Sequence, residues 1–296
     1  MPVPAAVVKS ARVPFLVLTP AVLLLALAIG LYAGAGLQPV YVAVALLAAI
    51  SAHISVNALN EYSDFHSGLD DMTLRTPFSG GSGALPAEPK AAAAVGALGV
   101  VTLLLTIGGG LWLVWQRGWG LLPLGLAGAL LIVTYTRWLN RSPWPCLLAP
   151  GLAFGPLMVV GGSWVVSGHF QPLALWLSLL PFALSNNLLL LNQWPDREPD
   201  RLVGRRHLAI VYGLKMVLWV YGLQWLLALL VLVSALLVMQ VTGWGWLVLL
   251  PMAGGLFALQ GMARKAESSA SLAPYLAANV VTAVLTPALL GVALLV

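Results

Sequence analysis

The chain has 296 residues, of which 60% are hydrophobic and only 8% are charged; its mean hydropathy is +0.96 and its formal net charge is +5. Soluble globular domains carry about 25% charged residues, so this composition excludes such a domain and predicts a polytopic membrane protein. Runs of about 20 apolar residues are long enough to cross a bilayer as helices. In chain order we expect nine of them, in one all-α transmembrane domain spanning 1–296, at residues 13–32, 40–60, 91–115, 121–138, 146–167, 172–193, 209–238, 244–262 and 274–296.

The basic residues indicate how this bundle is oriented. If the N-terminus is cytoplasmic, every one of the 14 Lys and Arg residues except Arg117 falls on the inner side, which is the bias of membrane proteins. We therefore expect an integral protein of a bacterial or archaeal plasma membrane with a cytoplasmic N-terminus. Because the positive charge reflects topology, no nucleic-acid partner is expected. The lone Cys146 excludes an intramolecular disulfide.

The acidic residues are concentrated in two polar gaps that follow the second and sixth apolar runs. Seven of the nine acidic residues are there: Glu61, Asp64, Asp70 and Asp71 in the first gap, and Asp196, Glu198 and Asp200 in the second. The other two are Glu88 and Glu267. Both gaps lie at the cytoplasmic ends of helices, where free carbonyl groups disfavour further negative charge and favour a bound cation. Asn60 and Asn192 precede Asp64 and Asp196 by four residues, which places each pair on one face of a helix.

Two clusters of this kind suit a magnesium-dependent diphosphate site. Mg²⁺ is usually held by one or two carboxylates together with substrate phosphates, so each cluster would bind an ion and both would hold one diphosphate. Arginines would neutralise the remaining phosphate charge, the candidates being Arg75, Arg137, Arg141, Arg205 and Arg206. The glycine-rich run at 80–83 either presents backbone amides to phosphate or is a flexible connector. The alternative for both clusters is a pair of ordinary solvated loops.

The residues of both gaps resemble the two signature motifs of the UbiA superfamily of intramembrane prenyltransferases. The matching residues are Asn60-Glu61-Tyr62-Ser63-Asp64 with Gly68 and Asp70, then Asn192, Asp196 and Asp200 with Gly204-Arg205-Arg206. The wider step from Asp64 to Asp70 and the Arg75-Thr76-Pro77 run are most similar to the branch with 1,4-dihydroxy-2-naphthoate prenyltransferases of menaquinone synthesis. Glu61 departs from the aspartate usual in the family, and Pro195 and Pro199 predict an interrupted helix in the second motif.

The resemblance implies Mg²⁺-dependent transfer of a prenyl chain from its diphosphate to an aromatic quinone precursor within the membrane lipids. It implies metal ligands at Asp64, Asp70, Asp196 and Asp200, with Glu61 as a further ligand, and contacts of Asn60 and Asn192 with the diphosphate. Tyr135 would stabilise an allylic cation through its ring; interfacial anchoring is its alternative role. A laterally open apolar chamber would hold the prenyl tail.

Other functions remain open from the residues alone. The acceptor could instead be 4-hydroxybenzoate or a non-aromatic compound of a lipid pathway. CDP-alcohol phosphatidyl transfer also uses magnesium-binding aspartates, but in one contiguous motif rather than two distant ones. An ion-coupled secondary transporter is the alternative of another class, although transporters bind near the bilayer midplane and these acids lie at one surface.

Overall fold

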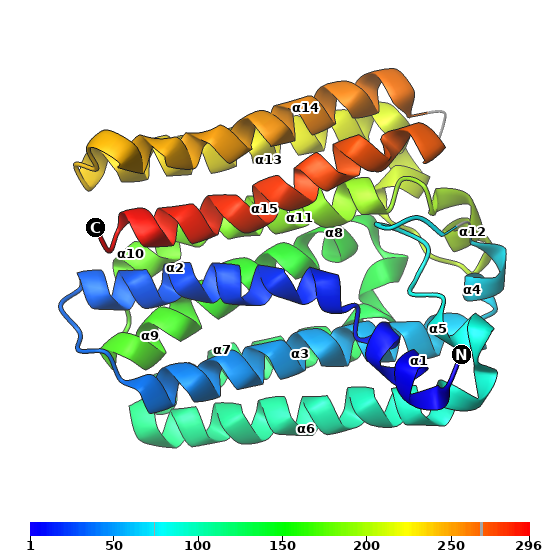
Figure 1. Cartoon of the computed structure of the whole chain (residues 1–296), viewed down its shortest axis with the longest axis horizontal. Coiled ribbons are helices and arrows are strands. Elements are labelled where there is room, and N and C mark those ends of the chain that lie inside the picture. Colours follow the sequence, from blue (N-terminus) through cyan, green and yellow to red (C-terminus); the bar gives the residue numbers. More distant parts are fainter. Residues whose placement is uncertain (74, 267–268) are drawn as a thin grey trace.

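The computed structural model describes residues 1–73, 75–266 and 269–296, and all regular structure within these ranges is helical. The long helices lie side by side in one bundle, with the N-terminus at one end and the C-terminus at the other (Figure 1). Eight helices in the described part of the chain are long and apolar enough to cross a bilayer, and Trp119–Tyr135 is a shorter apolar helix. The all-α membrane fold is therefore confirmed.

The helices follow one another closely along the chain. In order they are α1 (Val3–Ser10), η1 (Val13–Val17), α2 (Leu18–Tyr32), α3 (Pro39–His66), α4 (Leu69–Met72), α5 (Ala84–Ala87), η2 (Pro89–Ala91), α6 (Ala92–Arg117), η3 (Trp119–Leu121), α7 (Leu122–Tyr135), η4 (Leu139–Arg141), α8 (Pro143–Leu152), the π-helix η5 (Ala153–Val160), α9 (Gly161–Ser167), α10 (Pro172–Leu177), α11 (Leu179–Asn192), α12 (Arg197–Leu202), α13 (Leu208–Val238), η6 (Gly243–Leu249), α14 (Leu250–Lys265), η7 (Ser269–Leu272) and α15 (Ala273–Ala293).

Two of these boundaries decide where the acidic residues lie. Helix α3 continues to His66, six residues beyond the expected end at residue 60, so Glu61 and Asp64 are on a helix. Helix α11 ends at Asn192, and a turn separates it from α12. This is an interruption of the kind predicted for the second motif, and Pro195 lies in it, because proline disfavours helical geometry in the residue before it. Pro199 lies in the first turn of α12.

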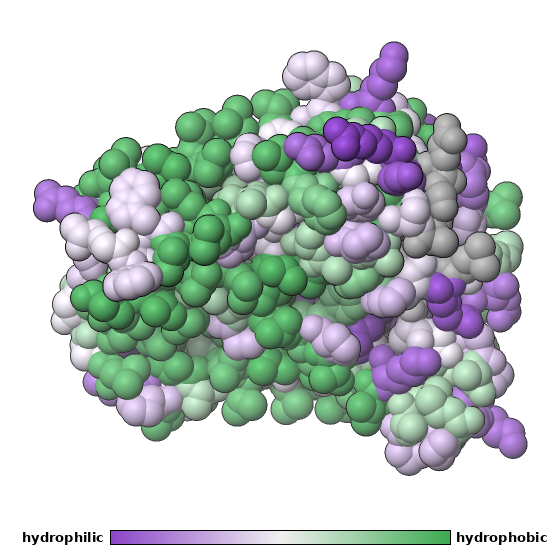
Figure 2. Space-filling view, turned by 45° about the horizontal axis from the view of Figure 1, so that its top comes forward, coloured by the Kyte–Doolittle hydropathy of each residue, from purple (hydrophilic) through white to green (hydrophobic). Residues whose placement is uncertain are grey.

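The bundle is held together by apolar packing between its long helices. Helix α3 packs along α6, α11 along α13, and α15 against both α14 and α2. Leu25, Ile29, Leu180, Leu232 and Leu290 are completely buried in the largest core cluster. The outer surface is apolar as well, and Figure 2 shows hydrophobic residues over the middle of the bundle and hydrophilic ones gathered mainly at one end. Such a surface suits contact with lipid tails.

The segments that carry both acidic clusters lie together at one end of the bundle. Helices α1, α4, α5 and α12 are all found there (Figure 1). The Asn57 side chain on α3 donates a 3.0 Å hydrogen bond to the Ala11 carbonyl, which fastens the N-terminal segment to this end. The Arg206 amide donates a 3.0 Å bond to the Asn140 carbonyl, which joins the connections that follow α12 and α7. The fold therefore brings the two clusters to the same place.

Candidate active site

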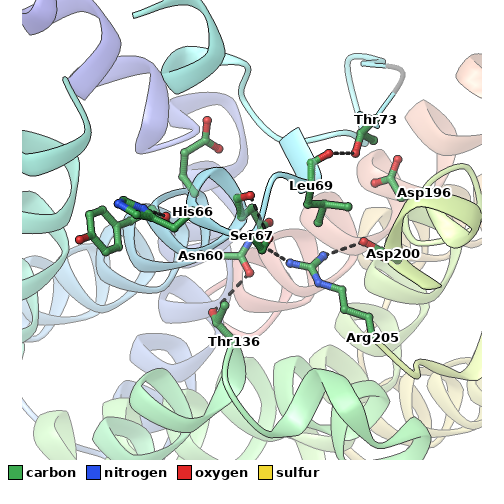
Figure 3. Close-up of polar contacts among 12 residues, drawn as sticks. Asn60, His66, Ser67, Leu69, Thr73, Thr136, Asp196, Asp200 and Arg205 are labelled. Atoms are coloured by element: carbon green, nitrogen blue, oxygen red, sulfur yellow. Dashed lines mark hydrogen bonds and ion pairs between the residues drawn. The ribbon is translucent and has the colours of Figure 1, made fainter. Parts of the chain in front are cut away.

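The last turns of α3 fix the carboxylate of Asp64. The side-chain amide of Asn60 donates a 2.8 Å hydrogen bond to Asp64 Oδ2, as expected for residues four apart on a helix. The oxygen of Asn60 accepts a 3.3 Å hydrogen bond from the hydroxyl of Thr136, which lies just after α7 (Figure 3). Asp64 is only 6% exposed. The first motif is therefore oriented by contacts from two helices before any ligand binds.

The short helix α4 carries Asp70 into the same region. Gly68 has a φ of 74°, a left-handed conformation that favours glycine, and it separates α3 from α4. Asp70 is buried, and Arg75 donates a 2.7 Å hydrogen bond to its backbone carbonyl. Gly81 lies so close that a Cβ at that position would stand 2.7 Å from Asp70 Oδ1. The backbone of the glycine-rich segment can approach this carboxylate only because residue 81 has no side chain.

The second motif buries its last aspartate between an arginine and a histidine. Asp200 is 2% exposed and accepts hydrogen bonds from Arg205 Nη1 at 2.9 Å and from His207 Nε2 at 3.0 Å. The backbone amide of Arg205 also bonds the Asp200 carbonyl at 3.0 Å, which closes the turn after α12. Asp196 is half-buried in the turn before α12. The two aspartates of this motif are thus held by local backbone geometry.

Direct contacts join the two motifs. The second terminal nitrogen of Arg205 donates to Asp64 Oδ1, so one guanidinium pairs with a carboxylate of each motif. The backbone amide of Gly80, in the connection between α4 and α5, donates a 2.8 Å hydrogen bond to Asp196 Oδ2. Figure 3 shows Arg205 extended between Asp200 and the end of α3, with Asp196 nearby. Motifs far apart in the sequence therefore form one site.

A cavity of about 570 Å³ opens from these groups into the bundle. Its polar lining residues include Arg12, Asn60, Asp64, Asp70, Tyr135, Asn140, Asn192, Asp196, Asp200 and Arg205. Its remaining lining is largely apolar and follows α6 as far as Val114, near the opposite end of that helix at Arg117. Small residues on α3 and α7, such as Ala45 and Gly128, face the same space. The site therefore consists of an ionic head joined to a long apolar cavity.

Some predicted site residues lie apart from this cavity. Arg75, Arg137, Arg141 and Arg206 are exposed and are not among its lining residues. The oxygens of Glu61, expected to contact metal, instead accept hydrogen bonds from Ser82 and Ala84. Arg205 is the one of the five predicted arginines that reaches both clusters in the described part of the chain.

The sequence interpretation missed Arg12, which it counted only as a topology signal. Arg12 lies between α1 and η1 with a φ of 53°, unusual for a residue with a side chain. It lines the cavity, and its Nη2 is 3.7 Å from where a Cβ of Gly81 would stand. Its position directly before the first apolar run was visible, but nothing in the pattern indicated that the chain turns it toward the acidic cluster.

Burial leaves two carboxyl groups of the site close to neutral pKa values. Burial raises the pKa of Asp70 to about 7, and the negative charges of Glu61 and Asp64 add to this shift. Burial likewise raises the pKa of Asp196 to about 7, although the hydrogen bond from Gly80 opposes the shift. Perturbed carboxyl groups facing a cavity are typical of functional sites.

The donor set fits a magnesium ion that shares its coordination with a ligand. Asp70 Oδ2, Asp196 Oδ1 and Asn192 Oδ1 are buried and have no hydrogen-bond partner among the residues that the structure describes, and all three are oxygen atoms of the kind Mg²⁺ prefers. Within the described residues, no three His, Cys, Asp or Glu side chains converge closely enough to hold an ion by themselves. Such a site suits Mg²⁺ with phosphate oxygens completing its shell.

The chain is a helical membrane bundle with two acidic motifs at the mouth of an apolar cavity. This arrangement is typical of intramembrane enzymes that act on substrates with a charged head and an apolar tail. The model of the UbiA prenyltransferase family matches residues 17–281 of the chain. The protein therefore belongs to the UbiA prenyltransferase family and is a prenyltransferase.

Solved structures of that family have the same fold. A UbiA homolog from Archaeoglobus fulgidus, bound to GPP and Mg²⁺, has a TM-score of 0.63 and 14% identity, covering 96% of this chain and 99% of that one. A digeranylgeranylglyceryl phosphate synthase has a TM-score of 0.65 and 14% identity over the full length of both chains. The apo UbiA homolog from Aeropyrum pernix K1 has a TM-score of 0.63 and 16% identity, covering 93% and 96%. A search of curated proteins gave no match.

Proposed function

We propose that this prenyltransferase catalyses Mg²⁺-dependent transfer of a prenyl group from a prenyl diphosphate to an acceptor within the bilayer. The observation that carries the proposal is the arrangement of the cavity, in which two aspartate motifs and two arginines surround one end and apolar side chains line the remainder. A prenyl diphosphate has the matching division into an anionic head and an apolar tail. The UbiA homolog from Archaeoglobus fulgidus bound to GPP and Mg²⁺ supports the same assignment.

The aspartates would hold the metal. Asp64, Asp70, Asp196 and Asp200 are the proposed ligands, and the free oxygens of Asp70 and Asp196 are available without breaking an existing hydrogen bond. Bound Mg²⁺ would supply electrostatic stabilisation of the diphosphate as negative charge develops on it. The sequence analysis predicted Glu61 as a further ligand, but its hydrogen bonds to Ser82 and Ala84 favour another role.

Arginine and asparagine side chains would bind the diphosphate itself. Arg205 and Arg12 both line the cavity, and the planar guanidinium group matches phosphate oxygens in bidentate geometry. Asn60 and Asn192 line the same region, and the free oxygen of Asn192 is suited to a metal-bound water or a metal. The exposed Arg75, Arg137, Arg141 and Arg206 would add a positive potential around the opening that attracts the anionic substrate.

The reaction would separate charge where the polar and apolar parts of the cavity meet. The bond between C1 of the prenyl chain and oxygen breaks, and its electron pair leaves with the diphosphate. The allylic cation left behind would be stabilised by the ring of Tyr135, which lines the cavity. A nucleophilic carbon or oxygen of the acceptor then bonds to C1 and loses its proton. The apolar walls exclude water, which would otherwise consume the cation.

The acceptor and the membrane arrangement complete the proposal. An aromatic quinone precursor such as 1,4-dihydroxy-2-naphthoate is our first candidate, supported by the spacing of Asp64 and Asp70. 4-Hydroxybenzoate and a lipid-pathway acceptor are the alternatives, the last favoured by the likeness to a digeranylgeranylglyceryl phosphate synthase.

Counting Trp119–Tyr135 with the eight longer helices, we propose nine spans, a cavity open to the lipid side, and a cytoplasmic site.

Purified protein incubated with a panel of prenyl diphosphates and these acceptors, with and without Mg²⁺, tests the proposal directly. We expect transfer that requires Mg²⁺ and that falls by at least about a hundredfold in Asp64→Ala and Asp196→Ala, since each removes an interaction with developing charge. Asp71→Ala is the matched control, because Asp71 is exposed and is not a lining residue of the cavity.

Retained, Mg²⁺-independent transfer by both variants would refute the roles given to the aspartates. Absence of transfer with every pair, together with ion-driven uptake in liposomes, would instead support the ion-coupled transporter.

A further inference from the structure

The carboxylate of Glu61 is buried and is bonded to a segment of the chain about 20 residues further on. Glu61 is 1% exposed. Its Oε2 accepts a 3.0 Å hydrogen bond from the Ser82 amide, and its Oε1 accepts one from the Ser82 hydroxyl and a 3.3 Å bond from the Ala84 amide. A buried carboxylate is costly unless it is paired or hydrogen-bonded, and these donors provide that compensation.

The segment that Glu61 holds is the glycine-rich loop, residues 79–84. Gly80, Gly81 and Gly83 all have positive φ values, of 81°, 70° and 68°, so the loop follows a path that residues with side chains rarely adopt. Its first residue, Ser79, is bonded to Thr76, and the Gly80 amide is bonded to Asp196. Glu61 supplies three hydrogen bonds at Ser82 and Ala84, so loss of its carboxylate would weaken the attachment of the later part of the loop.

The same loop touches the carboxylates of the site. The Gly80 amide donates to Asp196 Oδ2, in the second motif. Gly81 packs directly on Asp70 Oδ1, in the first. In the described part of the chain, Asp70 and Asp196 each keep one oxygen without a partner. The loop thus occupies one side of these two carboxyl groups and leaves the other oxygen of each available to a cation.

We propose that Glu61 is a positioning residue: it fastens the glycine-rich loop so that the loop orients Asp196 and Asp70 for metal and diphosphate. This inference rests on the proposed function, and it assigns Glu61 a role distinct from metal ligation. Glutamate suits the position because its extra methylene extends the carboxylate toward the backbone amides of 82 and 84. Glu61→Asp keeps the charge but withdraws the carboxylate by about one C–C bond, 1.5 Å.

Hydrogen exchange of the backbone amides of residues 80–84 tests the attachment without reference to activity. The measurement uses the purified full chain in detergent, without Mg²⁺ or substrate. We expect exchange in Glu61→Gln to accelerate by about tenfold or more, because charge-assisted hydrogen bonds that restrain local opening are lost. Ser82→Ala should accelerate the same amides to a smaller extent. Glu88→Gln, the same chemical change just after α5 at a side chain with no hydrogen bond among the described residues, should leave them unchanged.

Kinetics then separate a positioning residue from a metal ligand. We expect Ser82→Ala, which removes a hydroxyl that no metal would use, to raise the KM for prenyl diphosphate in the same direction as Glu61→Gln. The double variant should lose no more than Glu61→Gln alone, since both changes remove the same contact. Glu61→Asp should show faster loop exchange in spite of its retained carboxylate.

Three results would overturn the inference. One is unchanged exchange of residues 80–84 in Glu61→Gln. Another is a half-saturating Mg²⁺ concentration that rises at least tenfold in Glu61→Gln while Ser82→Ala behaves as the wild type. The third is a Glu61→Asp variant whose loop exchange and kinetics both equal those of the wild type. If Glu61→Gln fails to fold, Ser82→Ala decides the question by the first measurement. Absence of prenyl transfer by the wild type would refute the proposed function but would leave the exchange result valid.

Discussion

Arg205 donates hydrogen bonds to Asp64 and to Asp200, and the first of these partners lies 141 residues earlier in the chain. The side chains of Asp64 and Asp200 are only 8% and 3% exposed, so neither carboxylate is strongly screened by water. One guanidinium therefore pairs with a buried carboxylate from each motif, and its single positive charge offsets only part of their combined negative charge. A cation held by these carboxylates would offset the remainder and would let Arg205 interact with the diphosphate as well.

Replacement of Arg205 by lysine tests this dual role. Lysine keeps the positive charge but has a single terminal nitrogen and no planar fork, so it cannot pair with both carboxylates in the same way. We expect kcat/KM for prenyl diphosphate to fall by about tenfold or more, which corresponds to about 1.4 kcal/mol. Arg201→Lys is the matched control, because Arg201 is exposed and, among the described residues, pairs with the exposed Glu198 alone. Equal kinetics of both variants would contradict the role of Arg205.

Arg12, which lines the cavity near Gly81, is expected to bind the diphosphate. Arg12→Gln removes its charge while keeping a polar side chain of similar length, so the KM for prenyl diphosphate should rise by about tenfold, as for loss of a charge-assisted hydrogen bond. Lys9→Gln makes the same change of charge three residues earlier, at an exposed residue outside this cavity. It should leave the KM within about twofold, because an exposed charge contributes little. A rise in KM for both variants would show that only the net charge of the N-terminal segment matters.

The apolar runs were sufficient to predict an all-α membrane protein. The expected helix at 172–193 lies within one residue of α10 and α11 taken together, Pro172–Asn192. The pairing of Asn60 with Asp64 was also predictable, because residues four apart on a helix are neighbours whatever surrounds them. The prolines of the second motif correctly indicated the break after α11. These features depend on local sequence, and local sequence was enough to find them.

The contacts made by loops could not be predicted in this way. The first motif drew attention to Glu61, but its partners Ser82 and Ala84 are decided by the path of a glycine-rich loop. Arg12 reaches the site because its own backbone adopts a left-handed conformation. A side chain's direction after such a turn depends on tertiary packing rather than on periodicity. The sequence therefore predicted the helices and the acidic residues near their ends better than the contacts of the loop residues between the helices.

Binding of Mg²⁺ should depend on pH close to neutrality. The raised pKa values of Asp70 and Asp196, both about 7, mean that these carboxyl groups are largely protonated below pH 7 when no metal is bound. Metal binding requires the deprotonated form and releases protons. The half-saturating Mg²⁺ concentration should therefore decrease as the pH rises from 6 to 8 and then become constant. Calorimetry in buffers of different ionisation enthalpy measures the released protons directly.

The same pKa values predict that the metal-free protein becomes less stable as the pH rises, whereas its binding of Mg²⁺ becomes stronger. Between the ordinary aspartate pKa near 4 and the folded-state value near 7, the folded protein binds more protons than the unfolded chain. In the absence of metal, the free energy of unfolding should therefore decrease as the pH rises through this interval, and Mg²⁺ should reverse the loss. Asp70→Asn, which cannot titrate, is the control and should weaken both dependences. If calorimetry at pH 6.5 shows that Mg²⁺ binding releases no protons, the raised pKa values of Asp70 and Asp196 would be contradicted.

The length of the apolar cavity should limit which prenyl diphosphates react. On α3 its lining runs from Asp64 to Ala45, about 28 Å at 1.5 Å per residue. Gly128 on α7 lines the same space, about two helical turns or 10 Å from Tyr135, and a Cβ there would meet no atom within 4 Å. Gly128→Leu should therefore fill part of the cavity without displacing its neighbours.

We expect Gly128→Leu to discriminate between substrates by chain length. Transfer from dimethylallyl diphosphate should change by less than about twofold, whereas kcat/KM for geranylgeranyl diphosphate should fall by about tenfold, since a tail forced into occupied space costs about 1–3 kcal/mol. Gly108→Leu is the matched control: Gly108 lies in the middle of α6 with equally open surroundings but is exposed on the outer surface. Equal losses for short and long diphosphates in Gly128→Leu would show that the prenyl tail does not pass this residue, and the proposed direction of the tail would have to be abandoned.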